Sequence, residues 1–316
     1  MSIKKVVVIG GGVLGSQIAY QSAYCGFDVV TWVRSEGSIG RAKPKAERLH
    51  DIYVGELKAA KAGAPGPVSR GLVGNNADLS KIDFDKLINK AEEVYQNFTY
   101  ETDLAKAVAD ADLVIEALAE NPEEKKDFYA KLQKVLPEKT IIATNSSTLL
   151  PSMLADATGR PEKFLALHFA NSIWKNNTAE IMGHARTDQA AYDSVADFAV
   201  AINMIPLKLK KEKAGYILNS MLVPFLNAAE ELLVDGIADV ETIDKTWSLA
   251  TGAPLGPFRI LDIVGITTAY NIVSNYPDVQ TNPDGLHARI AKMLKEEYID
   301  KGKLGINAGE GFYKYK

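Results

Sequence analysis

A histidine and a glutamate, His168 and Glu180, are the residues of this chain whose types and spacing best fit proton transfer. His168 ends an apolar run that begins at Phe164, and Glu180 lies twelve residues later in a second apolar run. Two short strands joined by a turn would bring the two side chains together. The carboxylate would then keep one imidazole nitrogen protonated and leave the other free to accept a proton. This is dehydrogenase chemistry if a nicotinamide binds nearby.

A glycine-rich segment near the N-terminus supplies a site for such a nucleotide. The run Gly10-Gly-Gly-Val-Leu-Gly15 follows an apolar run at residues 5–9 and opens a helical pattern over residues 13–24. In this spacing the first glycine makes the turn, the second lets the backbone approach the pyrophosphate, and the third lets helix and strand pack closely. The phosphates would lie at the helix N-terminus. We therefore predict nucleotide contacts from Gly10, Gly12, Val13, Leu14 and Gly15.

The expected second strand, residues 28–33, does not end in the acidic residue that commonly holds the adenosine ribose. Val33 stands at that position, and Arg34 and Ser35 follow it. An arginine there can bind a 2′-phosphate or stack on adenine, whereas Glu36 could also reach the ribose. Arg34 could equally be a solvated loop cation. We predict Val33 and Arg34 as cofactor contacts, with NAD as the cofactor and NADP as the alternative.

Short apolar and β-branched runs alternate with helical patterns in the first part of the chain. The runs occupy residues 5–9, 28–33, 113–116, 140–144 and 164–168. Strands that are apolar throughout and separated by helices indicate a parallel sheet covered on both faces. The expected fold is an α/β Rossmann domain with a doubly wound parallel sheet, residues 1–207, followed by an all-α domain, residues 208–316.

The segment over residues 35–94 interrupts this alternation. It is rich in charged residues and too long for a simple connection between a strand and a helix. We predict that it is a helical excursion from the Rossmann domain.

The composition indicates a globular protein without a strongly charged partner. The chain has 316 residues, of which 47% are hydrophobic, enough for about two domains. A net charge of −4 favours neither nucleic acid nor an anionic membrane. The single cysteine, Cys25, suits a reducing cytoplasm, and the apolar run Val6–Ile9 is too short for a signal or membrane segment. We expect a cytoplasmic protein with no nucleic-acid or membrane partner.

Further polar residues stand at the ends of apolar runs, and their order resembles that of a known family. The segments are Glu116–Lys125, Asn145–Ser147, His168–Asn171, Glu180, Gly215–Asn219, 252–262 and 309–315. Together with the glycine-rich run they resemble the L-3-hydroxyacyl-CoA dehydrogenase family, which includes the 3-hydroxybutyryl-CoA dehydrogenases. The similarity spans nearly the whole chain and is weak only over residues 35–94.

The resemblance implies roles for particular residues. His168 would be the general base and Glu180 its orienting partner, while Ser147 and Asn219 would hydrogen-bond the reacting end of the substrate. Glu120, Lys125 and Asn171 would lie near the nicotinamide and its ribose, and Asn145 is the remaining predicted cofactor contact. Glu120 could instead cap the helix that starts nearby, and no metal ligands are predicted.

Two departures from the family pattern lie close to the predicted site. Ser172 stands where the family usually has proline, and the residues before Glu180 are more polar than usual. A polar wall beside the reacting carbon suits a small or polar substrate better than a long acyl chain. We therefore expect short L-3-hydroxyacyl-CoA substrates. The alternative is a 3-hydroxy acid without CoA, as in the gulonate and carnitine dehydrogenases.

Two further classes are possible on this fold. A non-catalytic nucleotide binder, as the crystallin relative of this superfamily illustrates, would not need His168, Glu180, Ser147 and Asn219 together. The lysine-based β-hydroxyacid dehydrogenases would place a lysine where the Asn219 motif stands.

We also predict a homodimer through the helical domain, because residues 221–226 and 258–264 offer more apolar surface than that domain can bury alone.

Overall fold

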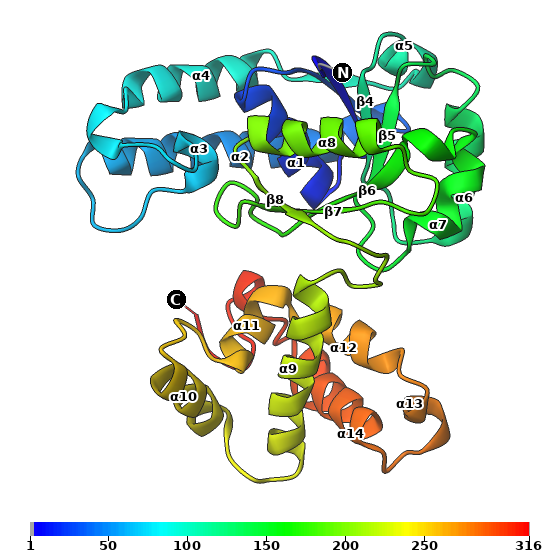
Figure 1. The fold of residues 1–316 in the computed structure, drawn as a ribbon. Coiled ribbons are helices and arrows are strands. Elements are labelled where there is room, and N and C mark those ends of the chain that lie inside the picture. The colour runs from blue at the N-terminus through cyan, green and yellow to red at the C-terminus, as the bar shows by residue number, and fades with distance from the viewer. Residues whose placement is uncertain (1–2, 316) are drawn as a thin grey trace. The chain divides into compact units, whose positions relative to one another are not determined.

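The computed structural model describes residues 3–315, and the chain forms two compact units that divide between Ile217 and Leu218. The first unit contains the sheet, and the second contains helices α9 to α14 (Figure 1). The sequence-based division at residues 207 and 208 lies a little earlier, at the end of β8 (Ile205–Lys208). That strand belongs to the sheet, and the residues after it remain in the first unit, where the Leu209 N–H donates to the Ile181 carbonyl at 2.9 Å and the Ile217 N–H donates to Glu180 at 2.8 Å.

Eight strands form one sheet in the order β3-β2-β1-β4-β5-β6-β7-β8. Besides β8 they are β1 (Lys5–Ile9), β2 (Asp28–Trp32), β3 (Thr99–Glu101), β4 (Leu113–Glu116), β5 (Ile141–Thr144), β6 (Phe164–Phe169) and β7 (Thr178–Met182). All neighbouring strands are parallel except β6 and β7, which are antiparallel. The predicted doubly wound sheet is confirmed.

Alternate residues of β1 show that both faces of the sheet are covered. Val6 and Val8 pack in one core with α1 (Val13–Tyr24) and α8 (Gln189–Ala201). Val7 and Ile9 pack in a second core with α5 (Leu104–Val108) and α6 (Pro122–Leu132). Because each face is buried, the central strands are largely apolar, and the carboxyl ends of the parallel strands are where polar side chains become available.

The segment after β2 forms α2 (Glu36–Lys61), α3 (Arg70–Val73) and α4 (Phe84–Gln96), while α7 (Pro151–Leu154) follows β5. Buried hydrogen bonds tie this segment to α1. The Tyr53 hydroxyl donates to Gln21 Oε1 at 2.6 Å, and Gln21 Nε2 donates to the Gly71 carbonyl at 2.8 Å. The excursion over residues 35–94 is therefore packed on the nucleotide-binding half of the sheet.

Within the described residues, the second unit contains six α-helices, followed by short helical turns. They are α9 (Leu218–Val234), α10 (Val240–Thr251), α11 (Pro257–Val264), α12 (Ile266–Ser274), α13 (Asp278–Thr281) and α14 (Leu286–Met293). Phe258, Leu261 and Ile290 are central to its core. The buried carboxylate of Asp262 accepts the backbone N–H groups of Phe312 and Tyr313 at 2.7 and 2.9 Å, which fixes the C-terminal segment. No helix within residues 3–315 has the length and apolar character needed to cross a membrane.

Candidate active site

The sheet register brings His168 and Glu180 together. His168 of β6 lies directly opposite Glu180 of β7, and Nδ1 of the imidazole is 3.0 Å from Oε2 of the carboxylate. The two residues are only 5% and 3% exposed. The other carboxylate oxygen, Oε1, accepts the Ile217 N–H at 2.8 Å. With both oxygens bonded, the carboxylate has a fixed orientation and keeps Nδ1 protonated.

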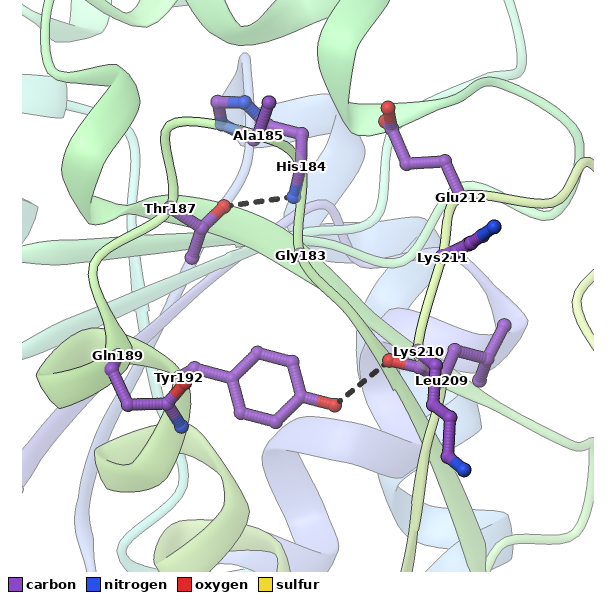
Figure 2. A pocket seen from close by; sticks show the side chains of 10 residues that line it. All are labelled: Gly183, His184, Ala185, Thr187, Gln189, Tyr192, Leu209, Lys210, Lys211 and Glu212. Atoms are coloured by element: carbon purple, nitrogen blue, oxygen red, sulfur yellow. Dashed lines mark hydrogen bonds between the residues drawn. The ribbon is translucent and has the colours of Figure 1, made fainter.

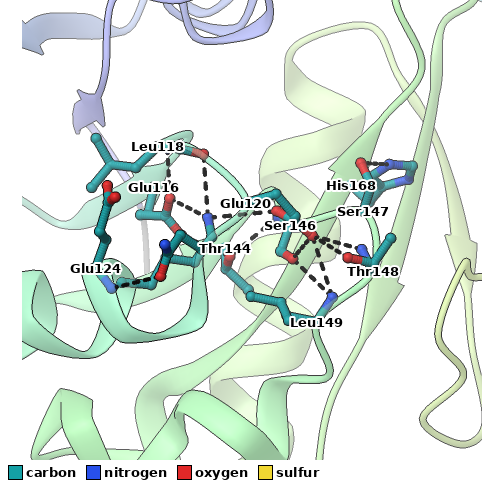
Figure 3. Close-up of polar contacts among 12 residues, drawn as sticks. Glu116, Leu118, Glu120, Glu124, Thr144, Ser146, Ser147, Thr148, Leu149 and His168 are labelled. Carbon is teal, nitrogen blue, oxygen red and sulfur yellow. Dashed lines mark hydrogen bonds and ion pairs between the residues drawn. The ribbon is translucent and has the colours of Figure 1, made fainter. Parts of the chain in front are cut away.

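Ser147 completes a hydrogen-bonded chain with this pair. Its Oγ lies 3.1 Å from Nε2 of His168 (Figure 3). In a neutral imidazole protonated at Nδ1, Nε2 is the acceptor, so the Ser147 hydroxyl donates to it. Asn145, earlier in the same loop, accepts the Phe169 N–H at 3.1 Å. That contact fixes the loop after β5 against the end of β6, and so holds Ser147 beside the imidazole.

Tyr216 covers one face of the His168 imidazole. Its ring stacks on the imidazole with centroids 4.4 Å apart and an angle of 11° between the planes. Its hydroxyl donates to the Ser146 carbonyl at 2.7 Å, and burial raises its pKa, so the phenol stays neutral. We did not predict a role for Tyr216. The available signal was its place in the Gly215–Asn219 segment, but no local pattern indicates a stacking contact.

A buried ion pair joins Glu116, the last residue of β4, to Lys125 of α6. Lys125 is 1% exposed, and its Nζ is 2.6 Å from Oε1 of Glu116, which is fully buried. Tyr129 and Thr144 donate to the other oxygen of Glu116, both at 2.8 Å. The predicted contact of Lys125 with the nicotinamide ribose stays a prediction. Glu116 was not predicted, although a glutamate that ends an apolar strand could have indicated a buried charge.

Glu120 connects the loops that follow β4 and β5 (Figure 3). It accepts a hydrogen bond from the Ser146 hydroxyl and from the N–H and hydroxyl of Thr148, the latter two at 2.8 Å. Burial acts to raise the pKa of Glu120, but these hydrogen bonds and the charge of Lys125 lower it overall. Asn121, not Glu120, caps α6. Glu120 therefore has the charge and place of a positioning residue, and its contact with a cofactor stays a prediction.

The glycine-rich loop has the shape that a dinucleotide requires. A Cβ on Gly10, whose φ is +111°, would lie 2.8 Å from the Ala117 carbonyl oxygen, and one on Gly15 would lie 2.1 Å from the Gly10 oxygen. A Cβ on Gly12 would meet nothing within 4 Å. The first and third glycines thus permit tight packing, and the second leaves open space before the N-terminus of α1. These residues fit a bound pyrophosphate.

A pocket of about 280 Å³ opens beside this loop. Gly10, Gly12, Val33 and Arg34 of the predicted cofactor contacts line it. Val13 is 62% exposed in the first turn of α1, and Leu14 is half-buried beside it. Val33 is 3% exposed, so it offers an apolar wall and no hydrogen bond to a ribose.

Two predicted residues lie outside the clusters described above. Asn171 is exposed in the loop after β6, and its carbonyl accepts from Asn176 Nδ2 at 2.8 Å. Asn219 is half-buried in the first turn of α9 and belongs to the second unit. Their contacts with cofactor and substrate remain predictions.

A larger pocket, of about 600 Å³, lies past the end of β7 (Figure 2). Gly183, His184, Tyr192, Lys210 and Lys211 are among its lining residues, and none of the predicted site residues is. His184 donates from Nε2 to the Pro161 carbonyl, and its Nδ1 accepts the Arg186 N–H. With both nitrogens bonded it is a structural histidine. Within residues 3–315 no cluster of three or more candidate metal ligands occurs.

A Rossmann sheet with a glycine-rich loop and a buried histidine–carboxylate pair is typical of a nicotinamide-dependent oxidoreductase. Two family models match this chain: the NAD-binding domain of 3-hydroxyacyl-CoA dehydrogenase over residues 5–212 and its C-terminal domain over residues 215–315. The chain belongs to the 3-hydroxyacyl-CoA dehydrogenase family. This confirms the family predicted from the order of the motifs, and NAD as its cofactor.

Individual relatives agree with this assignment. The chain is 33% identical to the human mitochondrial hydroxyacyl-coenzyme A dehydrogenase, over 99% of this chain and 92% of that protein. It is 29% identical to the 3-hydroxybutyryl-CoA dehydrogenase of Clostridioides difficile, over 98% and 99% of the two chains. Among solved structures, a diketoreductase acting on dicarbonyl compounds matches over the whole of both chains, with 51% identity and a TM-score of 0.85.

Proposed function

We propose that this protein interconverts a short 3-hydroxyacyl substrate and its 3-oxo form, with His168 as the acid–base residue. The observation that carries the proposal is the chain of hydrogen bonds Ser147–His168–Glu180, with distances of 3.1 and 3.0 Å. The pair is buried, so its charges act in a medium where electrostatic interactions are strong. A substrate oxygen bound at the free nitrogen would also lie beside the Ser147 hydroxyl.

Each of these three residues, and Tyr216 beside them, has a definite task in the proposed reaction. In the oxidation direction Nε2 of His168 takes the hydroxyl proton, and Glu180 stabilises the imidazolium that results. In reduction the same nitrogen returns the proton to the developing alkoxide. Ser147 donates a hydrogen bond to the substrate oxygen, and Tyr216 keeps water from one face of the imidazole. NAD held at the glycine-rich loop would supply the hydride acceptor for oxidation, and in its reduced form the hydride donor for reduction.

The substrate class that we favour is a CoA thioester whose acyl group has about four carbons. The support comes from relatives named 3-hydroxybutyryl-CoA dehydrogenase, which match almost the whole chain. The loop between β6 and β7 adds a physical argument. It carries the exposed residues Asn171 and Asn176, and polar groups of this kind fit a short or polar substrate better than a long acyl chain.

A second candidate is a 1,3-dicarbonyl or 3-hydroxy compound that carries no CoA. The specific observation in its favour is the 51% identity to a diketoreductase, higher than the identity to the CoA-dependent relatives above. Both candidates need the same proton transfer at His168. They differ in whether the chain recognises the CoA nucleotide.

The experiment compares NADH oxidation with acetoacetyl-CoA and with ethyl acetoacetate. If the first candidate is right, kcat/KM for the thioester exceeds that for the ester by more than about 10²-fold, because binding energy from the CoA moiety is used at the reacting carbon. Equal values, or a higher value for the ester, would contradict it and support the CoA-free candidate. No turnover of either compound would contradict both.

We further propose that the protein acts in the cytoplasm as a homodimer formed through the helical unit. A groove of about 380 Å³ between α9 and α10 supports the dimer. Its lining is almost wholly apolar and includes Phe225, Leu232 and Trp247, of which Leu232 is 41% and Trp247 39% exposed. A second copy of the chain is the partner that this surface suits.

The proposed cytoplasmic location rests on a separate observation. The single cysteine, which cannot form an internal disulfide, suits a reducing compartment.

A further inference from the structure

The adenosine end of the dinucleotide pocket is lined by cations. Arg34 follows β2, and Arg41 and Lys45 lie on α2; all three line the pocket that also contains Gly10 and Gly12. Ser38, Arg41 and Lys45 are separated by three and four residues, so they share one face of the helix. The second strand of a Rossmann domain ends beside the adenosine ribose, which is where these cations stand.

The position of α2 against the glycine-rich loop explains why its cations reach the pocket. A Cβ on Gly11 would lie 2.7 Å from the Cβ of Ala42 and 3.1 Å from a methyl group of Val33. The α2 helix therefore lies so close to the loop that a side chain at position 11 would collide with Ala42. Arg41 and Lys45, on either side of this contact, are held at the rim of the pocket.

None of the three cations has an anionic partner in the part of the chain that the structure describes. Arg41 Nη2 donates to the Ser38 hydroxyl at 2.8 Å, and Lys45 Nζ donates to the Arg41 carbonyl at 2.5 Å, but neither residue nor Arg34 forms an ion pair within residues 3–315. Glu36 is exposed and is not among the lining residues. The pocket thus has several cationic donors and no carboxylate.

We propose that this pocket accepts the 2′-phosphate of NADP(H), so that the protein binds NADP(H) as well as NAD(H). A carboxylate directly after β2 would accept a hydrogen bond from the ribose 2′-hydroxyl and would repel a phosphate, but the residue at that position is Val33. Arg34 and Arg41 supply planar guanidinium donors, Lys45 supplies a point charge, and the Ser38 hydroxyl is already oriented by Arg41. The inference concerns binding alone and does not rest on the reaction proposed above.

The test is a titration of the full-length protein with NAD⁺ and with NADP⁺, without substrate. Quenching of tryptophan fluorescence can follow binding, because Trp32 lines the pocket, and calorimetry provides an independent readout. The proposal predicts a Kd for NADP⁺ no more than about tenfold above that for NAD⁺, since charge-assisted hydrogen bonds to the phosphate offset its desolvation. A larger ratio would overturn it.

Variants separate the phosphate site from the rest of the nucleotide site. Arg34→Ala and Arg41→Ala should each weaken NADP⁺ binding by about tenfold. Arg41→Ala should change NAD⁺ binding by less than about threefold, because the proposal uses the Arg41 charge only for the 2′-phosphate. Lys43→Ala, which removes an exposed cation of α2 outside the pocket, should change neither. Equal losses for both nucleotides in Arg41→Ala, or no loss for NADP⁺, would overturn the proposal. Because no turnover is measured, this result is independent of the substrate question.

Discussion

The hydroxyl of Ser147 points to the free nitrogen of His168, where the proposed mechanism also places a substrate oxygen. Replacing Ser147 with alanine removes one donor to the developing alkoxide. We expect kcat to fall by about 10²-fold, as for the loss of one donor to a developing oxyanion. The melting temperature should change little, because Ser147 is only half-buried. Steady-state kinetics with NADH tests this. A native rate in Ser147→Ala, or an equal loss in the exposed control Ser152→Ala, would contradict the role.

Glu230 of α9 is an isolated buried carboxyl. It is 1% exposed, one of its oxygens has no hydrogen-bond partner within the described residues, and burial raises its pKa to about 8 from 4.5. Between these values the unfolded chain releases the proton while the folded chain keeps it, so the free energy of unfolding falls as pH rises. Each pKa unit corresponds to about 1.4 kcal/mol. The destabilisation is therefore absent at low pH and complete above the folded pKa.

Glu230→Gln removes this dependence and keeps the shape of the side chain. We expect thermal unfolding of the variant to match the native protein at about pH 4.5 and to occur several degrees higher at about pH 8, a difference that follows from the linkage. Circular dichroism at both pH values measures it. Glu231→Gln, at the exposed neighbouring position, is the control and should show no such trend. A constant difference across the pH range would contradict the assignment of Glu230.

At the scale of single residues, the sequence predicted the groups that carry charge or a hydroxyl but not their surroundings. His168, Glu180 and Ser147 follow from their order at the ends of apolar runs, and the structure brings these three together. Tyr216 could not be predicted in the same way, because stacking depends on how a distant loop returns to β6. The burial of Lys125 against Glu116 also depends on tertiary packing and has no local signal.

At the scale of elements, the loop from β6 to β7 departs from the family pattern for a physical reason. Ser172 has a φ of +58°, and its N–H donates to Gln17 Oε1 of α1 at 2.9 Å. Proline fixes φ near −65° and has no N–H, so it could satisfy neither condition. The loop in this chain is therefore built around serine, and it links the nucleotide-binding helix to the segment that carries Asn171.

Ser172→Pro tests this account of the loop. We expect a loss of stability of about 1–3 kcal/mol or more, from the strained φ and the lost hydrogen bond. Ser172→Gly, which tolerates a positive φ and keeps the N–H, should be close to native in stability. Denaturant unfolding of the two variants provides the comparison. Equal stability of the proline and glycine variants would show that the backbone conformation at Ser172 is not the constraint inferred here.

The strands that the sequence predicted and those it did not differ in burial. The strands β4, β5 and β6 are buried throughout, and their apolar runs identified them. We predicted neither β3 nor β8, the two edges of the sheet. The first has three residues, and the second contains Pro206 and ends at Lys208. Edge strands are often short and tolerate proline and lysine, because one side of the strand has no partner strand. These features weaken the apolar pattern by which a strand is predicted from sequence.

At the scale of the whole molecule, the apolar groove between α9 and α10 predicts self-association. Light scattering coupled to size-exclusion chromatography should give twice the mass of one chain. Trp247→Glu places a charge in the groove and should yield a monomer, because an unpaired charge is costly in an apolar interface. The control Ile306→Glu changes an exposed apolar side chain outside the groove and should leave the dimer intact. A monomeric native protein would contradict the proposal.

The role of His168 is the central claim, and one measurement tests it most directly. The rate of NADH oxidation should be compared between the native protein and His168→Gln, with whichever of acetoacetyl-CoA and ethyl acetoacetate the native protein reduces faster. Loss of a positioned general acid should lower kcat by about 10²–10⁴-fold. NADH binding, followed by fluorescence, should remain within about threefold of native, because the imidazole acts on the substrate proton and not on nucleotide affinity. A glutamine variant that keeps near-native kcat would contradict the account.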